Sequence, residues 1–116
     1  MYDQNNIFAK ILRKEIPCNI VYEDNTSLFF YDINPLFKIH VLGIPKIACK
    51  DYSDFIEKSD PSLRSQFFEN IKIVINKLDI SKSGYRLVSN SGTDGGQEVP
   101  HFHVHILGGE KISPIK

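Results

Sequence analysis

The sequence predicts an α+β domain in which one short N-terminal helix and one long central helix accompany a five-stranded, mainly antiparallel sheet. Short apolar segments that alternate with polar residues recur along the chain, and two segments space their apolar residues as helices do. The helices do not alternate regularly with the strands, as they would around a parallel sheet. A chain of 116 residues is the size of one domain, so residues 1–116 are expected to form a single unit.

Local patterns place the first four elements. Apolar residues at helical spacing predict a helix over Asn6–Lys14, which Pro17 closes. Three strands then follow, separated by short turn sequences: Ile20–Tyr22, Leu28–Asp32 and Ile39–Ile44.

The second half begins with the long helix. Asp60 suits the N-cap and Pro61 the first helical position, and the helix is expected to end near Leu78. Its apolar stripe is wide enough for deep packing on the sheet or for a contact between subunits. The stripe consists of Leu63, Phe67, Ile71, Val74 and Leu78, widened by Phe68 and Ile75. Two further strands, Tyr85–Ser89 and His101–Leu107, complete the sheet.

Composition restricts the classes of function. The formal net charge is zero, so the chain lacks the basic field that binds DNA or RNA, and no nucleic-acid partner is expected. No segment has the length and apolar character of a membrane span or of a signal peptide, so no membrane association is expected either. Cys18 and Cys49 lack C-x-x-C spacing and suit reduced thiols in a cytoplasmic protein.

Three of the four histidines lie two residues apart in the stretch HFHVHIL. A strand would place His101, His103 and His105 on one face, with the apolar residues between them on the other. Three interpretations are open: a solvated strand face, a set of zinc ligands, or the reactive groups of an active site. The outer two histidines are about 13 Å apart along a strand, which disfavours one ion held by all three.

A glycine-rich loop, SNSGTDGGQEV, precedes the histidines. Glycine lets backbone amides converge on an anion where a side chain would obstruct them. The loop is equally typical of a flexible turn when taken alone, but beside a histidine strand it favours a phosphate site. The P-loop motif and the dinucleotide-binding glycine motif are both absent from the sequence.

Two other polar residues interrupt apolar segments. His40 lies in KIHVLGIPK, on the strand face expected to hold Leu42 and Ile44, and Asp32 closes the run SLFFYDI. Both also have a purely structural interpretation, because a lone strand histidine is usually a hydrogen-bonded structural residue and an aspartate often ends a strand.

These segments together resemble the histidine triad (HIT) nucleotide-binding family, most closely its Hint-like branch. The resemblance covers nearly the whole chain and depends on NIFAKILRKEIP, FFYDINP, HVLGIPK, YRLVSNSGTDGGQEV and HFHVHILGG, in the family's order and spacing. It implies the five-stranded fold, paired as a homodimer. It also implies hydrolysis of purine nucleoside 5′-phosphoramidates, or of related nucleoside monophosphate derivatives, through a nucleotidylated histidine and without a cofactor.

The resemblance implies a role for each candidate residue. His103 matches the nucleophile, and His105 matches the group that hydrogen-bonds a non-bridging phosphate oxygen. His101 and His40 match the supporting network, and Asp32 matches the carboxylate that binds the ribose hydroxyls. The implied base pocket and phosphate loop comprise Ile7, Phe8, Ile11, Phe30, Ile33, Asn90, Gly96, Gln97, Glu98 and Val99.

The chain departs from the family at two places. Some bacterial relatives hold a structural zinc through C-x-x-C near the N-terminus; Asn6 and Ala9 occupy those positions here, so no metal is expected. Glu98 stands where animal Hint proteins have a serine that helps the leaving amine depart. Two alternative functions stay open: a nucleotide-binding regulatory module with incidental activity, and a zinc hydrolase.

Overall fold

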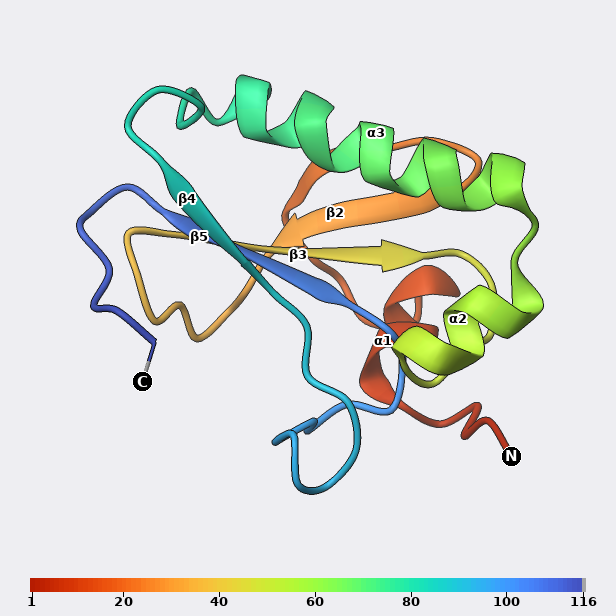
Figure 1. Ribbon diagram of the computed structural model, residues 1–116. Helices are drawn as coiled ribbons and strands as arrows, with labels where there is room; N and C mark the ends of the chain where they lie inside the picture. The colour runs from red at the N-terminus through yellow and green to blue at the C-terminus, as the bar shows by residue number, and fades with distance from the viewer. Residues whose placement is uncertain (116) are drawn as a thin grey trace.

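The computed structural model describes residues 1–115, and Lys116, the last residue of the predicted domain, lies outside them. The predicted α+β class is confirmed, with one helix more than expected (Figure 1). In chain order the elements are α1 (Ile7–Leu12), β1 (Ile20–Glu23), β2 (Ser27–Tyr31), β3 (Ile39–Pro45), α2 (Tyr52–Lys58), α3 (Pro61–Lys77), β4 (Tyr85–Val88) and β5 (Val104–Gly108).

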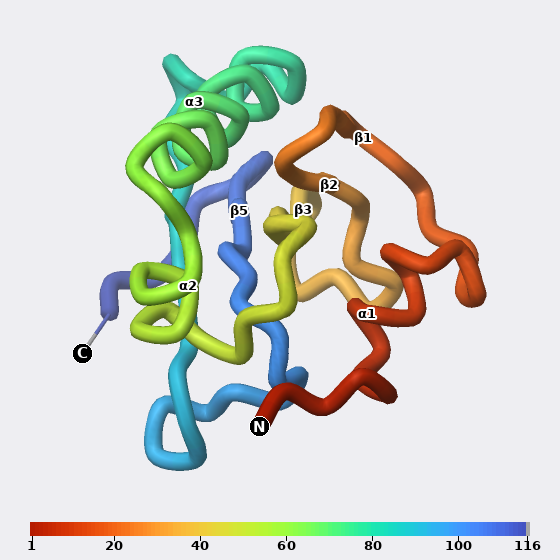
Figure 2. Tube along the Cα trace, turned by 90° about the vertical axis from the view of Figure 1, so that its right-hand side faces the viewer, coloured from red at the N-terminus to blue at the C-terminus, as the bar shows by residue number. Residues whose placement is uncertain are grey.

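The five strands form one antiparallel sheet in the order β1-β2-β3-β5-β4. Helix α1 covers one face, and α2 and α3 cover the other (Figure 2). Each face has its own apolar core. Strands β2 and β3 supply both cores through their alternating side chains, so Leu42 and Ile44 pack toward α1 whereas Val41 packs toward α3. The predicted sharing of faces along β3 is confirmed.

Helix α1 is shorter than predicted. Asn6 is its N-cap, and the side-chain oxygen of Asn6 accepts a hydrogen bond of 2.9 Å from the Ala9 amide. Lys14 adopts a φ of 63°, which an α-helix cannot accommodate, so the helix stops before it. Asn6 and Ala9 are thus a helix cap and its hydrogen-bond partner in this chain.

Strand β5 begins at Val104, not at His101 as predicted. Pro100 has no backbone donor, and the next two amides bind outside the β-ladder. The His101 amide donates to the Val99 carbonyl at 2.8 Å, and the Phe102 amide donates to the Cys49 carbonyl at 2.9 Å. The alternation predicted from the sequence nevertheless persists through this segment, because Phe102, Val104 and Ile106 all enter the core beneath α3.

Helix α3 packs its predicted stripe against the sheet, with two differences. Phe68 remains 47% exposed, whereas Asn70 is fully buried. The Asn70 side-chain nitrogen donates to Oδ2 of Asp24 at 2.7 Å and to Oγ of Ser27 at 2.8 Å. Asn70 therefore ties the helix to the turn between β1 and β2, and these bonds satisfy the N–H donors of its buried side chain.

Two further structural features concern membrane-spanning helices and the cysteines. Within residues 1–115, no helix combines the length and apolar character needed to cross a membrane. Both cysteines are free thiols, and burial raises the pKa of Cys49 to about 12, so that thiol stays protonated at neutral pH.

Candidate active site

A cavity of about 390 Å³ opens on the α1 side of the sheet. Its wall combines one residue of α1, the loop between β2 and β3, strand β3, the segment before β5, and β5 itself. This size suits a small-molecule ligand. The lining residues are Phe8, Asp32, Asn34, Leu36, His40, Leu42, Asn90, Gly96, Glu98, Val99, His103 and His105.

The register of the sheet brings two histidines together. Leu42 of β3 lies directly opposite His105 of β5, so His40, two residues before Leu42, faces the same side. Nε2 of His40 is 2.9 Å from Nδ1 of His105. The Asp32 amide donates to the His40 carbonyl at 3.0 Å, and Asp32 Oδ2 lies 3.4 Å from His40 Nε2.

A backbone amide fixes the tautomers of this pair. The Leu36 amide donates to Nδ1 of His40 at 3.1 Å, so a neutral His40 holds its proton on Nε2. That proton is donated to Nδ1 of His105, which must then hold its own proton on Nε2. His105 therefore offers a ligand an N–H donor.

His103 has the opposite tautomer. Its Nδ1 lies 2.7 Å from the His101 carbonyl, which can only accept, so the proton is on Nδ1. Nε2 of His103 consequently retains a lone pair. The ring is buried and packs edge-on against Phe8 with centroids 5.0 Å apart, and the His105 ring is also 5.0 Å away. A nucleophilic nitrogen and a hydrogen-bond donor thus stand side by side.

Burial keeps these imidazoles neutral. Desolvation lowers the pKa of His40 and of His103 below the usual value, and the Asp32 carboxylate opposes this only partly. Burial, with smaller contributions from His103 and His40, lowers the pKa of His105 to about 4. At neutral pH, His103 therefore has an unprotonated nitrogen available for attack.

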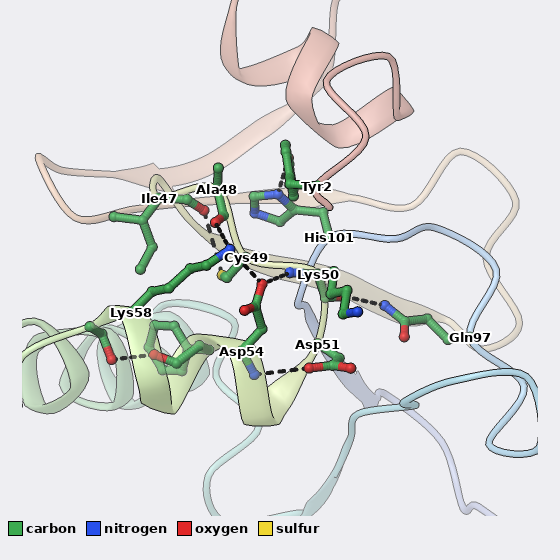
Figure 3. A network of polar contacts seen from close by, with 12 residues as sticks. Tyr2, Ile47, Ala48, Cys49, Lys50, Asp51, Asp54, Lys58, Gln97 and His101 are labelled. Atoms are coloured by element: carbon green, nitrogen blue, oxygen red, sulfur yellow. Dashed lines mark hydrogen bonds and ion pairs between the residues drawn. The ribbon is translucent and has the colours of Figure 1, made fainter.

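His101 lies behind the cavity and does not line it. Its ring is fully buried between two partners, and Nε2 is 2.9 Å from the Pro45 carbonyl. Nδ1 is 2.6 Å from the Tyr2 hydroxyl (Figure 3). His101 contacts His103 through its backbone carbonyl. The His101 imidazole holds this segment of the chain in place through its bonds to Pro45 and Tyr2. Nothing in the sequence pattern marked Tyr2.

The glycine loop is held by its own side chains. Gln97 donates from Nε2 to the Lys50 carbonyl at 2.6 Å (Figure 3). The same nitrogen donates to the Val99 carbonyl at 2.9 Å, and Oε1 of Gln97 accepts from the Gly92 amide. Asn90 donates to the Gly95 carbonyl at 2.8 Å. Gln97 does not line the cavity, and its side chain closes the loop instead.

Two loop amides remain available to a ligand. The amides of Gly96 and Gln97 bind carbonyls within the loop, at 3.1 Å and 3.0 Å. Within residues 1–115, the amides of Glu98 and Val99 have no hydrogen-bond acceptor, and both residues line the cavity. Together with Nε2–H of His105, they are donors for an anion in the cavity.

The predicted apolar contacts are divided between the cavity and the core. Phe8 lines the cavity, whereas Ile11 and Phe30 are buried in the core on the α1 side. Ile7 and Ile33 are exposed and lie outside the cavity lining, with Ile33 81% exposed. Three lining residues were not expected from the sequence: Asn34, Leu36 and Leu42.

One cluster has a composition that could hold a metal ion. The ligand atoms of Asp32, His40 and His105 all lie within 4.8 Å of one another. Coordination through Nε2 of His40 would require a proton on Nδ1, where the Leu36 amide already donates. The arrangement therefore fits a proton held between two imidazoles better than it fits an ion.

Comparisons with known proteins identify the family of this chain. The family model described as the HIT domain matches residues 13–112. An uncharacterized HIT-like protein of Rickettsia prowazekii is 44% identical over 112 residues, which cover 97% of this chain and 93% of that protein. The purine nucleoside phosphoramidase of Escherichia coli is 38% identical with the same coverage.

A solved histidine triad protein from Clostridium difficile is 36% identical, with a TM-score of 0.89 over 100% of both chains. A HIT family hydrolase from Legionella pneumophila is 38% identical, with a TM-score of 0.87 over 94% of this chain and 96% of that one. This chain is therefore a member of the HIT domain family.

Proposed function

We propose that this chain hydrolyses purine nucleoside 5′-phosphoramidates through a nucleotidyl intermediate on His103. The observation that supports this most strongly is the pair of opposite tautomers, with a free lone pair on His103 Nε2 and an N–H donor on His105 Nε2. The purine nucleoside phosphoramidase of Escherichia coli, 38% identical, supports the choice of the P–N bond.

The cavity offers partners for each part of such a substrate. The Asp32 carboxylate has two acceptor oxygens that suit a ribose diol, and Oδ1 is held by the Asn34 amide at 2.8 Å. Phe8 offers an apolar surface for the base. The non-bridging phosphate oxygens accept from His105 Nε2–H and from the amides of Glu98 and Val99, which stabilise the charge that increases in the transition state.

The reaction takes place in two displacements. Nε2 of His103 attacks phosphorus and forms a P–N bond, while the bond from phosphorus to the leaving amine breaks and the amine takes a proton from water. The His101 carbonyl accepts from Nδ1–H of the nucleotidylated imidazolium. A water then attacks phosphorus, its proton passes to solvent, and the electron pair returns to Nε2. The products are the nucleoside monophosphate and the free amine.

Turnover of adenosine 5′-phosphoramidate by the purified chain, with and without EDTA, tests this proposal. We expect many turnovers per enzyme and no loss of rate on chelation, because His103 supplies the nucleophile without an ion. Tight AMP binding with no turnover would instead indicate a nucleotide-binding regulatory module. Loss of activity in EDTA that Zn²⁺ restores would indicate a zinc hydrolase.

We also propose that the chain forms a homodimer through α3 and β4. Strand β4 is at the edge of the sheet, and Phe68, Tyr85 and Leu87 are each more than 40% exposed around a hollow between the two elements. An open sheet edge beside exposed apolar side chains favours association. Light scattering should give about twice the chain mass of 13.3 kDa, and Leu87→Glu should shift it toward the monomer. A monomeric wild-type protein at micromolar concentration would contradict the proposal.

A further inference from the structure

The cavity contains negative charge and no cationic side chain. Of the residues that line it, Asp32 and Glu98 are acidic, and within residues 1–115 no lysine or arginine contributes to its wall. The histidines of the wall do not compensate, because burial lowers the pKa of His40, His103 and His105. An anionic phosphate bound in this cavity would therefore interact with neutral N–H groups and not with a cationic side chain.

The two carboxylates occupy different depths. The Asp32 side chain is 22% exposed and has two fixed neighbours, the Asn34 amide and Nε2 of His40. Glu98 is exposed, and no ion pair within residues 1–115 includes it. Its charge is thus free to interact with a group that enters or leaves the cavity.

The direction of displacement places the leaving group near Glu98. In phosphoryl transfer, the attacking and leaving atoms lie roughly in line on opposite sides of phosphorus. His103 is only 6% exposed, so attack comes from the buried side and the leaving group points toward solvent. Glu98 lines the cavity and is itself exposed to solvent, and its own amide is one of the two free donors for the phosphate.

We propose that Glu98 selects substrates by the charge of the leaving group. Amines that bear a second, cationic group are preferred over neutral amines, and leaving groups that bear a carboxylate or further phosphates are disfavoured. This inference rests on the proposed hydrolysis and specifies its substrate class. The preference should be modest and sensitive to salt, on the order of tenfold in kcat/KM between a cationic and an anionic leaving group, because Glu98 is exposed to solvent.

Three adenosine 5′-phosphoramidates of similar size test the proposal: those of propylamine, 1,3-diaminopropane and β-alanine. Their leaving groups are neutral, cationic and anionic. The measured quantity is the ratio of kcat/KM for the cationic substrate to that for the anionic one, compared between protein variants so that intrinsic reactivity cancels. We expect Glu98→Gln to lower this ratio by roughly tenfold, and Glu98→Lys to lower it further.

Asp94→Asn is the matched control. Asp94 lies in the same loop and is also exposed, but it does not line the cavity, so the ratio should stay as in the wild type. An equal effect of Asp94→Asn would mean that the charge of the loop as a whole acts at long range, and would overturn the assignment to Glu98.

The outcomes separate this inference from the function on which it depends. If Glu98→Gln slows all three substrates equally, Glu98 acts on proton transfer, and charge selection is wrong while the hydrolysis stands. If the wild-type protein hydrolyses none of them, the proposed function fails. The charge preference is then measured as the ratio of the dissociation constants of the intact cationic and anionic compounds, in place of the ratio of kcat/KM. A charge preference in binding that Glu98→Gln removes would still support selection by Glu98, and its absence would refute it.

Discussion

His103→Ala is expected to lower the turnover of adenosine 5′-phosphoramidate by several orders of magnitude and to leave AMP binding nearly unchanged. Among the cavity imidazoles within residues 1–115, His103 is the one whose lone pair is not already engaged by a donor, and the substitution removes it. The groups proposed to bind AMP remain: Asp32, Phe8, the two loop amides and His105. Loss of a covalent nucleophile typically costs far more than loss of one hydrogen bond.

Two quantities are measured, kcat and the dissociation constant of AMP by calorimetry. The dissociation constant also tests whether the variant is folded. An AMP affinity close to that of the wild type shows that the cavity is intact. A His103→Ala protein that retains AMP binding and turns over at a rate similar to the wild type would rule out His103 as the nucleophile.

His105→Ala is expected to have the next largest effect, a loss of about 10²–10³ in kcat, by analogy with removal of a single oxyanion donor. Nε2–H of His105 is lost, but His103 and its bond to the His101 carbonyl are untouched. His105→Gln provides the matched comparison, because a side-chain amide can restore a donor without an imidazole ring. We expect Gln to recover part of the rate in steady-state assays. An equal loss in both variants would show that the ring, and not its N–H, is required.

Much of the fold follows from periodicity. The alternation in HFHVHIL predicted that Phe102, Val104 and Ile106 enter the core, and they do. Helix α2 escaped prediction because only Phe55 of its seven residues is buried, so no apolar stripe exists. The start of β5 was predicted wrongly because the Phe102 amide donates to the Cys49 carbonyl and not to the β-ladder. Cys49 is distant in sequence, so no local pattern indicates this bond.

The site was predictable as a set of residue types but not as a set of proton positions. Histidine spacing and the glycine loop indicated where the candidate site lies. The tautomers depend on the Leu36 amide, the His101 carbonyl and the Pro45 carbonyl. Any residue type supplies such a carbonyl, and any except proline supplies such an amide, so these groups leave no sequence signal. Tyr2 bonds to His101 across 99 positions, and an isolated tyrosine near the start of the chain gives no pattern to detect.

The central claim, that backbone contacts make His103 alone nucleophilic, is tested most directly by locating the covalent intermediate. Substrate labelled with ³²P at the α-phosphorus is mixed with excess enzyme, the reaction is quenched during a single turnover, and the acid-labile label is mapped to a residue by peptide analysis. The label should be on His103 and should be absent from His103→Ala. Label on His101 or His105, or complete turnover without any enzyme-bound label, would contradict the account.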